Sequence, residues 1–241
     1  MKKVLVTLMI ACVAVSVFAK EKPKSGLGVQ IGWTQPILRL NSPDNPSYAK
    51  DSLSNKVKMN GVKVGLVYDE SFFAGFGSSI GINYTFATAN TAWRQKNIIS
   101  LYPQTHTRTQ YHALELFIDW QYKFEVAKEA YLMLYSGPTI QCGLVYNTIT
   151  EEKGMDGKID PNATTEYMHY KDNNTPDEDL TRLNVTWGVG AGIQYKNFFI
   201  RGGYDFGLIN PYKHADFENG NHTRGRLDQW SIKLGAYMWY K

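Results

Sequence analysis

Eight segments of this chain alternate large apolar residues with small or polar ones, a pattern typical of β-strands. In the stretch "YHALELFIDWQYKF", residues 111–124, Leu114 and Ile118 share one face while Glu115 and Asp119 share the other. The remaining segments lie at 27–34, 62–68, 76–87, 131–144, 185–195, 198–208 and 230–240. Such repeated alternation predicts an all-β fold in which every strand has two chemically different faces.

The chemistry of the two faces indicates what lies against each. One face carries the aliphatic and aromatic side chains, and the other carries mostly Gly, Ser and Thr with a few charges. A soluble barrel would fill its interior with apolar side chains, so the arrangement here is inverted. The pattern predicts an eight-stranded antiparallel transmembrane β-barrel with lipid outside. Its glycine-rich inner face would hold the charges Lys63, Glu115, Asp119, Lys123, Arg201, Asp205 and Lys233.

The connections between these segments alternate in length. They are expected at 39–60, 69–75, 88–110, 125–129, 145–184, 196–197 and 210–228, so long and short connections alternate along the chain. Transmembrane barrels have long extracellular loops and short periplasmic turns. Pro138 interrupts the segment 131–144 and predicts a weakly paired or bulged position there.

The first nineteen residues have the pattern of a secretory signal peptide. Lys2 and Lys3 precede an apolar run that ends at Ala19, which predicts a cleaved secretory signal peptide over 1–19 and a barrel domain over 20–241. A lipid anchor on Cys12 fits less well, because the apolar run continues after it. The predicted signal peptide implies export, and together with the barrel pattern it implies localisation in the outer membrane.

Composition excludes several classes of protein. Removing Lys2 and Lys3 lowers the formal charge from +4 to +2, which gives no basis for a nucleic-acid partner. Cys142 is the one cysteine after the leader, so no disulfide within the chain is expected. No apolar run after residue 19 is long enough for a membrane helix.

The inner charges are expected to neutralise one another, because an isolated charge in so narrow a space is costly. Glu115, Asp119 and Asp205 would pair with the four inner cations. Asp205 and Lys233 are expected to be the first pair, on the assumption that they sit at similar heights on neighbouring strands. The resulting network would plug the lumen.

Outward-facing aromatic residues should form two belts at the membrane interfaces. The expected periplasmic belt comprises Tyr68, Phe76, Tyr122, Phe124, Tyr195, Phe198 and Tyr240. The expected outer belt comprises Trp33, Phe86, Trp187, Phe206 and Trp230.

One region resembles a known family. The run "LNVTWGVGAGIQYKNFFIRGGYDFGLIN", residues 183–210, combines a Gly-x-Gly-x-Gly strand, a two-residue turn and an Arg-x-x-Tyr-x-x-Gly-Leu-x-Asn ending. It is similar to the outer-membrane β-barrel family common in Bacteroidota, described as porin-family or PorT-like, and the strand pattern extends the likeness over 26–241. The resemblance implies a barrel of the OmpA and OmpX type and an outer-membrane location. Such barrels usually end on an aromatic residue, whereas here Tyr240 is followed by Lys241.

Apparent catalytic and metal motifs are weak. Residues 77–81 match the nucleophile pattern G-x-S-x-G but lie within an alternating segment, and His112 has no identifiable serine and acid partners. The acidic stretch 145–184 could bind calcium, but it lacks a D-x-D-x-D-G spacing, so solvated loops are favoured. We therefore expect no enzyme activity, no cofactor and no metal.

Two function classes remain. The favoured one is a plugged, porin-like structural barrel at the cell surface, most simply a monomer, contacting outer-membrane lipid and lipopolysaccharide and displaying loops for adhesion or protein partners. The alternative is a small channel or a secretion-associated, PorT-like component.

Overall fold

A computed structural model describes residues 25–41, 56–92, 94–97, 100–154, 156–170, 180–211 and 224–240. Among these residues, no helix is long and apolar enough to span a membrane. The expected signal peptide lies outside the described residues. The strands are β1 (Gly26–Asn41), β2 (Lys56–Lys58), β3 (Asn60–Phe73), β4 (Phe76–Asn90), β5 (Arg94–Asn97), β6 (Ser100–Ala127), β7 (Ala130–Lys153), β8 (Ile159–Met168), β9 (Leu183–Tyr195), β10 (Phe198–Gly207) and β11 (Arg224–Tyr240).

Eight of these strands close into an antiparallel barrel. The pairing order runs β6-β4-β3-β1-β11-β10-β9-β7, and β6 also pairs with β7, which joins the two ends of the sheet. The predicted all-β, eight-stranded barrel is confirmed. Closure leaves the barrel wall without an unpaired edge, as a spanning sheet requires.

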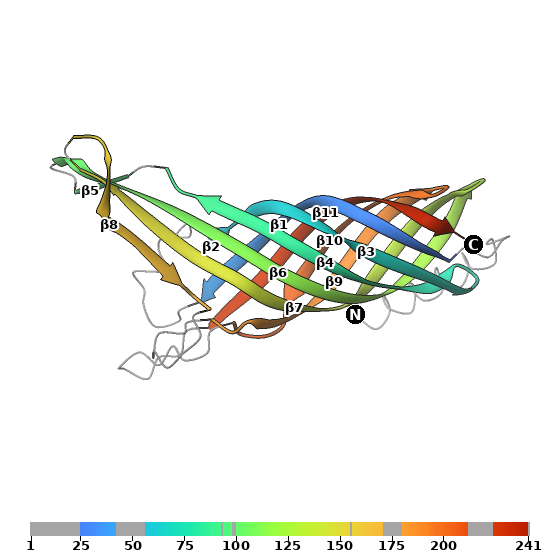
Figure 1. Ribbon diagram of the computed structural model, residues 1–241. Coiled ribbons are helices and arrows are strands. Elements are labelled where there is room, and N and C mark those ends of the chain that lie inside the picture. Colours follow the sequence, from blue (N-terminus) through green and yellow to red (C-terminus); the bar gives the residue numbers. More distant parts are fainter. Residues whose placement is uncertain are drawn as a thin grey trace, which may run out of the picture.

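Three short turns gather at one end of the barrel, opposite β5 and β8 (Figure 1). They join β3 to β4, β6 to β7 and β9 to β10. Ala74, Gly75, Glu129 and Lys196 adopt positive φ angles of 45°, 83°, 60° and 52° in them. This end is periplasmic by the rule that transmembrane barrels keep short turns there. The Pro138 prediction also fits, because the β6–β7 ladder skips Ile118 and Asp119 opposite it.

The predicted loops 88–110 and 145–184 contain the most strand residues, so their boundaries are wrong. Strand residues also lie within the predicted connections 39–60, 69–75, 125–129 and 210–228. β6 has 28 residues and β7 has 24, far more than the 9 to 11 that a tilted strand needs to cross a bilayer. They stay paired beyond the end of β4, whose last residue Asn90 lies opposite Arg108, out to Gln104 opposite Lys153. β5 adds to β6 and β8 adds to β7, giving the projecting sheet at the left of Figure 1. We call this the extracellular sheet.

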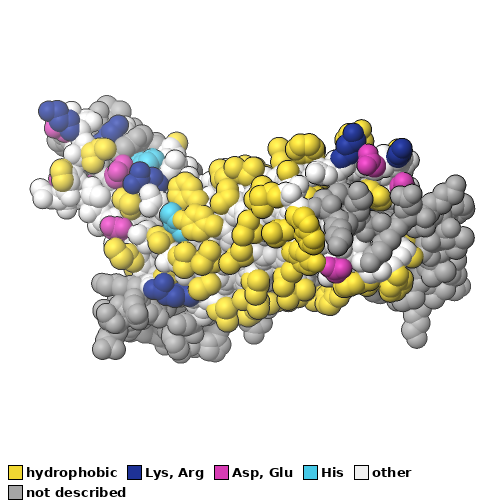
Figure 2. Space-filling model, turned by 45° about the vertical axis from the view of Figure 1, so that its right-hand side comes forward, with side chains coloured by type: hydrophobic (Ala, Val, Ile, Leu, Met, Phe, Trp, Pro, Cys, Tyr) yellow, Lys and Arg dark blue, Asp and Glu magenta, His cyan; other side chains and the backbone are white. Residues whose placement is uncertain are grey.

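The two faces of the wall segregate as the alternation predicts. Large apolar side chains cover the outside of the barrel (Figure 2), while Lys63, Glu115 and Arg201 are buried inside it. The alternation over 230–240 predicts that Trp239 shares the inner face of Lys233 and Tyr237, but Trp239 is 54% exposed, so this prediction is wrong. The pairing shifts register there, since Leu27 lies opposite Trp239 and Gly28 opposite Tyr237. This bulge turns Met238 and Trp239 outward together.

The expected belt residues face outward or lie half-buried on the outer surface. Phe76 lies opposite Tyr122, and the Tyr122 and Phe124 rings are 4.5 Å apart at the periplasmic end. At the other end, the Trp230 ring lies 4.6 Å from that of Tyr204. The exposed members are Trp33, Phe86, Trp187, Tyr195, Phe198, Phe206 and Trp230, and the half-buried ones are Tyr68, Phe76, Tyr122 and Phe124. The side chain of Tyr240 lies outside the described residues.

Candidate functional site: the filled lumen and the barrel surface

The lumen is filled in layers that can be followed along β11. From the extracellular end, Leu227 belongs to an apolar cap, Gln229 to an amide layer, Lys233 to a charged layer and Tyr237 to a second apolar cluster. Each of the remaining seven barrel strands also contributes inner residues to one or more of these layers. The layering follows from the alternation, which sends every second side chain of all eight strands into one narrow space.

The apolar cap closes the extracellular mouth. Its members are Leu38, Met59, Ala87, Tyr111, Ala113, Tyr146, Tyr170, Leu180 and Leu227. Tyr170 follows β8, and burial raises the pKa of its hydroxyl. The Arg182 guanidinium donates to the Tyr170 carbonyl over 2.5 Å and thereby ties this segment to the start of β9. The cap was not predicted, because it is built partly from segments read as loops.

Below the cap, amide side chains span the lumen. Gln141 donates to Gln229 over 2.8 Å, and Gln229 donates to the Thr34 hydroxyl over 2.5 Å. Asn184 donates to Gln141 over 2.8 Å. These bonds connect β7, β9, β11 and β1 across the interior, so they hold opposite walls together.

The charged layer contains one direct ion pair between predicted residues. Lys63 Nζ lies 2.6 Å from Glu115 Oε2, and the Thr85 hydroxyl donates to Glu115 Oε1 over 2.7 Å. Both charged side chains are almost fully buried. The pair is therefore satisfied by hydrogen bonding as well as by charge, which a buried ion pair requires.

The expected Asp205–Lys233 pair is wrong. Lys233 lies opposite Arg201 on β10, and Asp205 lies opposite Gln229, so the two residues are four positions out of register. Among the described residues, no ion pair within 4.0 Å joins Lys233 to Asp205 or Asp119. Instead, Lys233 Nζ lies 5.2 Å from the centre of the Phe117 ring.

Asp119, Asp205 and Lys233 line one small cavity of about 10 Å³. Tyr135 lies beside them in its lining. That volume is close to the space of a single water molecule. Solutes are larger than this space. The cavity is therefore suited to one ordered water molecule among charged and polar side chains.

The centre of the network is Asp69, which the sequence analysis missed. Arg201 Nη2 lies 2.5 Å and Lys123 Nζ 3.0 Å from Asp69 Oδ2. The Ser79 hydroxyl donates to Asp69 Oδ1 over 2.7 Å, and the Tyr237 hydroxyl donates to Oδ2. Lys123 and Arg201 thus pair with Asp69 instead of with the three predicted acids. Lys63, Gly65 and Val67 share the inner face, and continuing this alternation by one step would have predicted Asp69 there.

The motifs that resembled catalytic ones have structural partners. Ser79, the central serine of the G-x-S-x-G match, is buried inside the barrel and bonds Asp69 and Arg201. His112 Nδ1 lies 2.5 Å from the Tyr84 hydroxyl on the outer surface, and the Phe86 ring is 4.9 Å away. Within the described part of the chain, no group of three His, Cys, Asp or Glu side chains could hold a metal ion.

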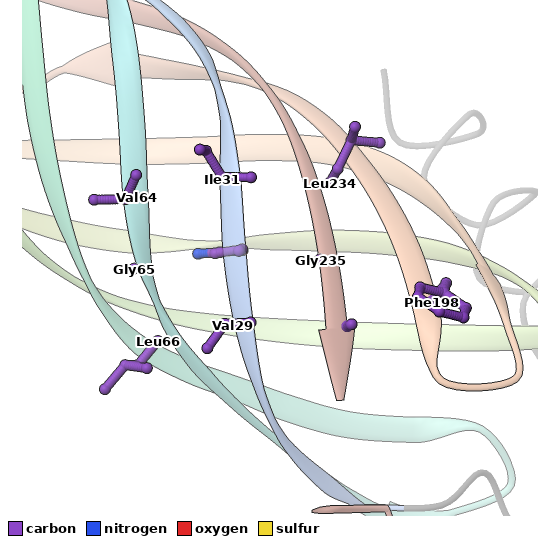
Figure 3. A pocket seen from close by; sticks show the side chains of 10 residues that line it. Val29, Ile31, Val64, Gly65, Leu66, Phe198, Leu234 and Gly235 are labelled. Atoms are coloured by element: carbon purple, nitrogen blue, oxygen red, sulfur yellow. The ribbon is translucent and has the colours of Figure 1, made fainter. Parts of the chain in front are cut away.

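An apolar groove of about 600 Å³ crosses the outer surface of β10, β11, β1 and β3. It is lined by Val29, Ile31, Val64, Leu66, Phe198 and Leu234 (Figure 3). Ala236 lies opposite both Phe198 and Val29, and its small side chain leaves the hollow. Gln30, whose backbone forms part of the floor, points inward and donates to Asn83. The groove is therefore part of the apolar outer band.

No curated protein matches the chain. Neisserial surface protein A shares 12% identity over 89% of this chain and 99% of its own, with a TM-score of 0.40. Ail of Yersinia pestis shares 11% identity over 89% and 98%, with a TM-score of 0.37. The N-terminal barrel domain of OprF of Pseudomonas aeruginosa shares 10% identity over 88% and 98%, with a TM-score of 0.30.

A family model described as outer membrane protein beta-barrel domain matches residues 25–212. The match covers seven of the eight barrel strands and the whole extracellular sheet, and the family implies an outer-membrane location. The chain belongs to the outer membrane protein beta-barrel domain family.

Proposed function

We propose that this protein is a closed, non-enzymatic outer-membrane barrel whose extracellular sheet binds a partner at the cell surface. The observation that carries the proposal is the continuation of β6 and β7 as a paired sheet beyond the barrel, widened by β5 and β8. A barrel that served only to seal or anchor would not need strands of 28 and 24 residues. Binding residues are often displayed on extensions of a rigid scaffold.

The filled lumen supports the non-conducting part of the proposal. An apolar cap, an amide layer and buried ion pairs occupy the described interior.

A small channel or a secretion-associated, PorT-like component is the alternative. The motif in 183–210 favours a place among the Bacteroidota barrels described as PorT-like, and we propose a monomer delivered by a cleaved signal peptide.

Two measurements test this function. The first is planar-bilayer recording of the refolded full-length protein, for which we expect no stepwise conductance. Discrete conductance steps that change when Lys63 and Glu115 are neutralised together would replace the proposal with the channel alternative.

The second measurement removes the extracellular sheet. Residues 91–107 and 150–168 would each be replaced by a short Gly-Ser linker, which leaves the barrel pairing from Tyr111 and Tyr146 inward intact. Cells displaying the full chain and the shortened chain would be compared for attachment to host cells and for surface cross-linking to envelope proteins. We expect attachment or cross-links with the full chain and their loss with the shortened one, and equal behaviour of the two would refute the proposal.

A further inference from the structure

A row of cations crosses three strands at the extracellular rim. Arg39 on β1 lies opposite Arg226 on β11 on one side and opposite Lys56 on β2 on the other. In the next row, Lys58 and Asp228 flank Ile37. Among the side chains that the structure describes on this face of the three strands, Asp228 is the single carboxylate against the four cations Arg39, Arg226, Lys56 and Lys58. Like charges placed directly opposite on neighbouring strands destabilise a sheet, so an anion bound beside this row would stabilise it.

Asp228 holds two of these cations in place. Its side chain is fully buried, and its oxygens accept from Arg39 Nε over 2.7 Å and from Arg226 Nε over 2.8 Å. The Tyr204 hydroxyl and the Gly207 amide also donate to it, over 2.7 Å and 3.0 Å. Both arginines therefore bind the carboxylate through Nε, while the side chains of Arg39 and Arg226 remain 33% and 46% exposed. Arg39 Nη2 also donates to the Tyr204 hydroxyl over 3.3 Å. These bonds hold both guanidiniums in one orientation, and they leave Arg39 Nη1 and the terminal nitrogens of Arg226 to bind an anion.

The height of this row on the barrel points to its ligand. Trp230 lies on the same face as Arg226, four positions closer to the barrel centre, and packs against Tyr204, which also donates to Asp228. Aromatic residues of this kind sit at the boundary between hydrocarbon and headgroups. The cations just beyond them lie where the phosphate groups of the outer leaflet sit. In that leaflet, sugar phosphates of glycolipids provide such anions.

We propose that Arg39, Arg226, Lys56 and Lys58 bind the phosphorylated sugar headgroup of an outer-leaflet glycolipid. Asp228 acts as a positioning residue for the two guanidiniums. The arginines supply directed hydrogen bonds to phosphate oxygens, and the lysines supply charge. The site is separate from the extracellular sheet and does not depend on the partner proposed for that sheet.

Native mass spectrometry of the full-length protein in detergent tests the site. Diphosphoryl lipid A is titrated against the protein, with dephosphorylated lipid A of the same acyl chains and glucosamine 6-phosphate in parallel. We expect retention of the diphosphoryl form and at least tenfold weaker binding of the other two. The double variant Lys56→Gln/Arg226→Gln should weaken diphosphoryl lipid A binding about tenfold or more, since each cation near an anionic surface contributes to binding.

Lys128→Gln is the matched control, because it removes an exposed cation at the periplasmic turn, and it should bind as the wild type does. Folding of each variant is checked by its heat-dependent gel shift. If Arg226→Gln fails to fold, Lys56→Gln/Lys58→Gln on the three-residue β2 replaces it. Equal binding of both lipid A forms, or no weakening in the folded double variant, would overturn the site. Equally tight binding of glucosamine 6-phosphate would overturn the glycolipid as its ligand.

Discussion

Asp69 and Arg201 meet inside the barrel although 132 positions separate them in the sequence. Asp69 lies on the inner face of β3 near its periplasmic end, and Arg201 reaches it from β10 on the other side of the lumen. Lys123 approaches the same carboxylate from β6. A single acid therefore compensates two buried cations from two other parts of the wall.

Replacing Asp69 should be strongly destabilising. Asp69→Asn leaves Lys123 and Arg201 buried without a counter-charge, and removal of one partner from a buried ion pair costs about 3–5 kcal/mol. Guanidinium-induced unfolding of the protein in lipid vesicles measures the change in free energy. Glu129→Gln, which alters an exposed carboxylate on the β6–β7 turn, should stay within about 0.5 kcal/mol of the wild type. Equal effects of the two substitutions would rule out the central role of Asp69.

The apolar outer face should respond to a charge according to its depth in the membrane. Ile82→Arg places a cation near the middle of β4, opposite Leu116, and should cost about 2–4 kcal/mol in a bilayer. Phe198→Arg places the same charge next to the periplasmic turn and should cost about 0–1 kcal/mol. Refolding into vesicles with urea titration gives both values. A soluble barrel would show no such dependence on position.

Small inner residues make room for large ones, and Gly235 shows this directly. A Cβ on Gly235 would meet three atoms of the Phe199 ring before any other group. Gly235→Ala should therefore cost about 1–3 kcal/mol, the range typical of overpacking. Adding Phe199→Leu should recover part of this loss, which a double-mutant cycle would detect as a coupling of about 0.5–3 kcal/mol. Gly202→Ala is the control, because its nearest neighbouring atoms are 3.9 Å and 4.0 Å away.

The extracellular sheet and the barrel wall should differ in local stability. Backbone amides of 104–107 and 150–153 lie beyond the end of β4, whereas those of 114–123 lie within the closed barrel. Hydrogen exchange of the protein in nanodiscs should be faster at the outer positions, since opening there does not break the barrel. Equal protection along the whole of β6 would show that the sheet opens only together with the barrel.

Much of this fold could be predicted from the sequence, because alternation is a local signal that repeats in every strand. The eight barrel strands, the three short turns and the inward direction of Lys63, Glu115 and Arg201 all follow from it. Partner choice inside the lumen could not be predicted in the same way. It depends on register, and the assumption that Asp205 and Lys233 lie at the same height was wrong by four positions.

The ends of strands were the other source of error. Ending the predicted segment 62–68 at Tyr68 hid Asp69, and beginning the loops at 88 and 145 hid most of the extracellular sheet. Polar residues such as Thr107 and Thr150 lack the apolar alternation of the barrel, since no lipid faces them. They pair nonetheless, because the barrel below sets their register. Trp239 escaped prediction because a bulge changes the face on which later residues lie.

The unusual length of β6 and β7 also fixes how far this barrel can reach. Beyond the end of β4, from Arg108 to Gln104, the paired strands rise about 14 Å along their own direction, at roughly 3.4 Å per residue. The strands are continuous with the wall, so the projection is anchored by the same hydrogen-bond ladder that crosses the membrane. A contact made at its tip would therefore be held well clear of the membrane surface, and a pull on that tip would act along β6 and β7 on the barrel itself.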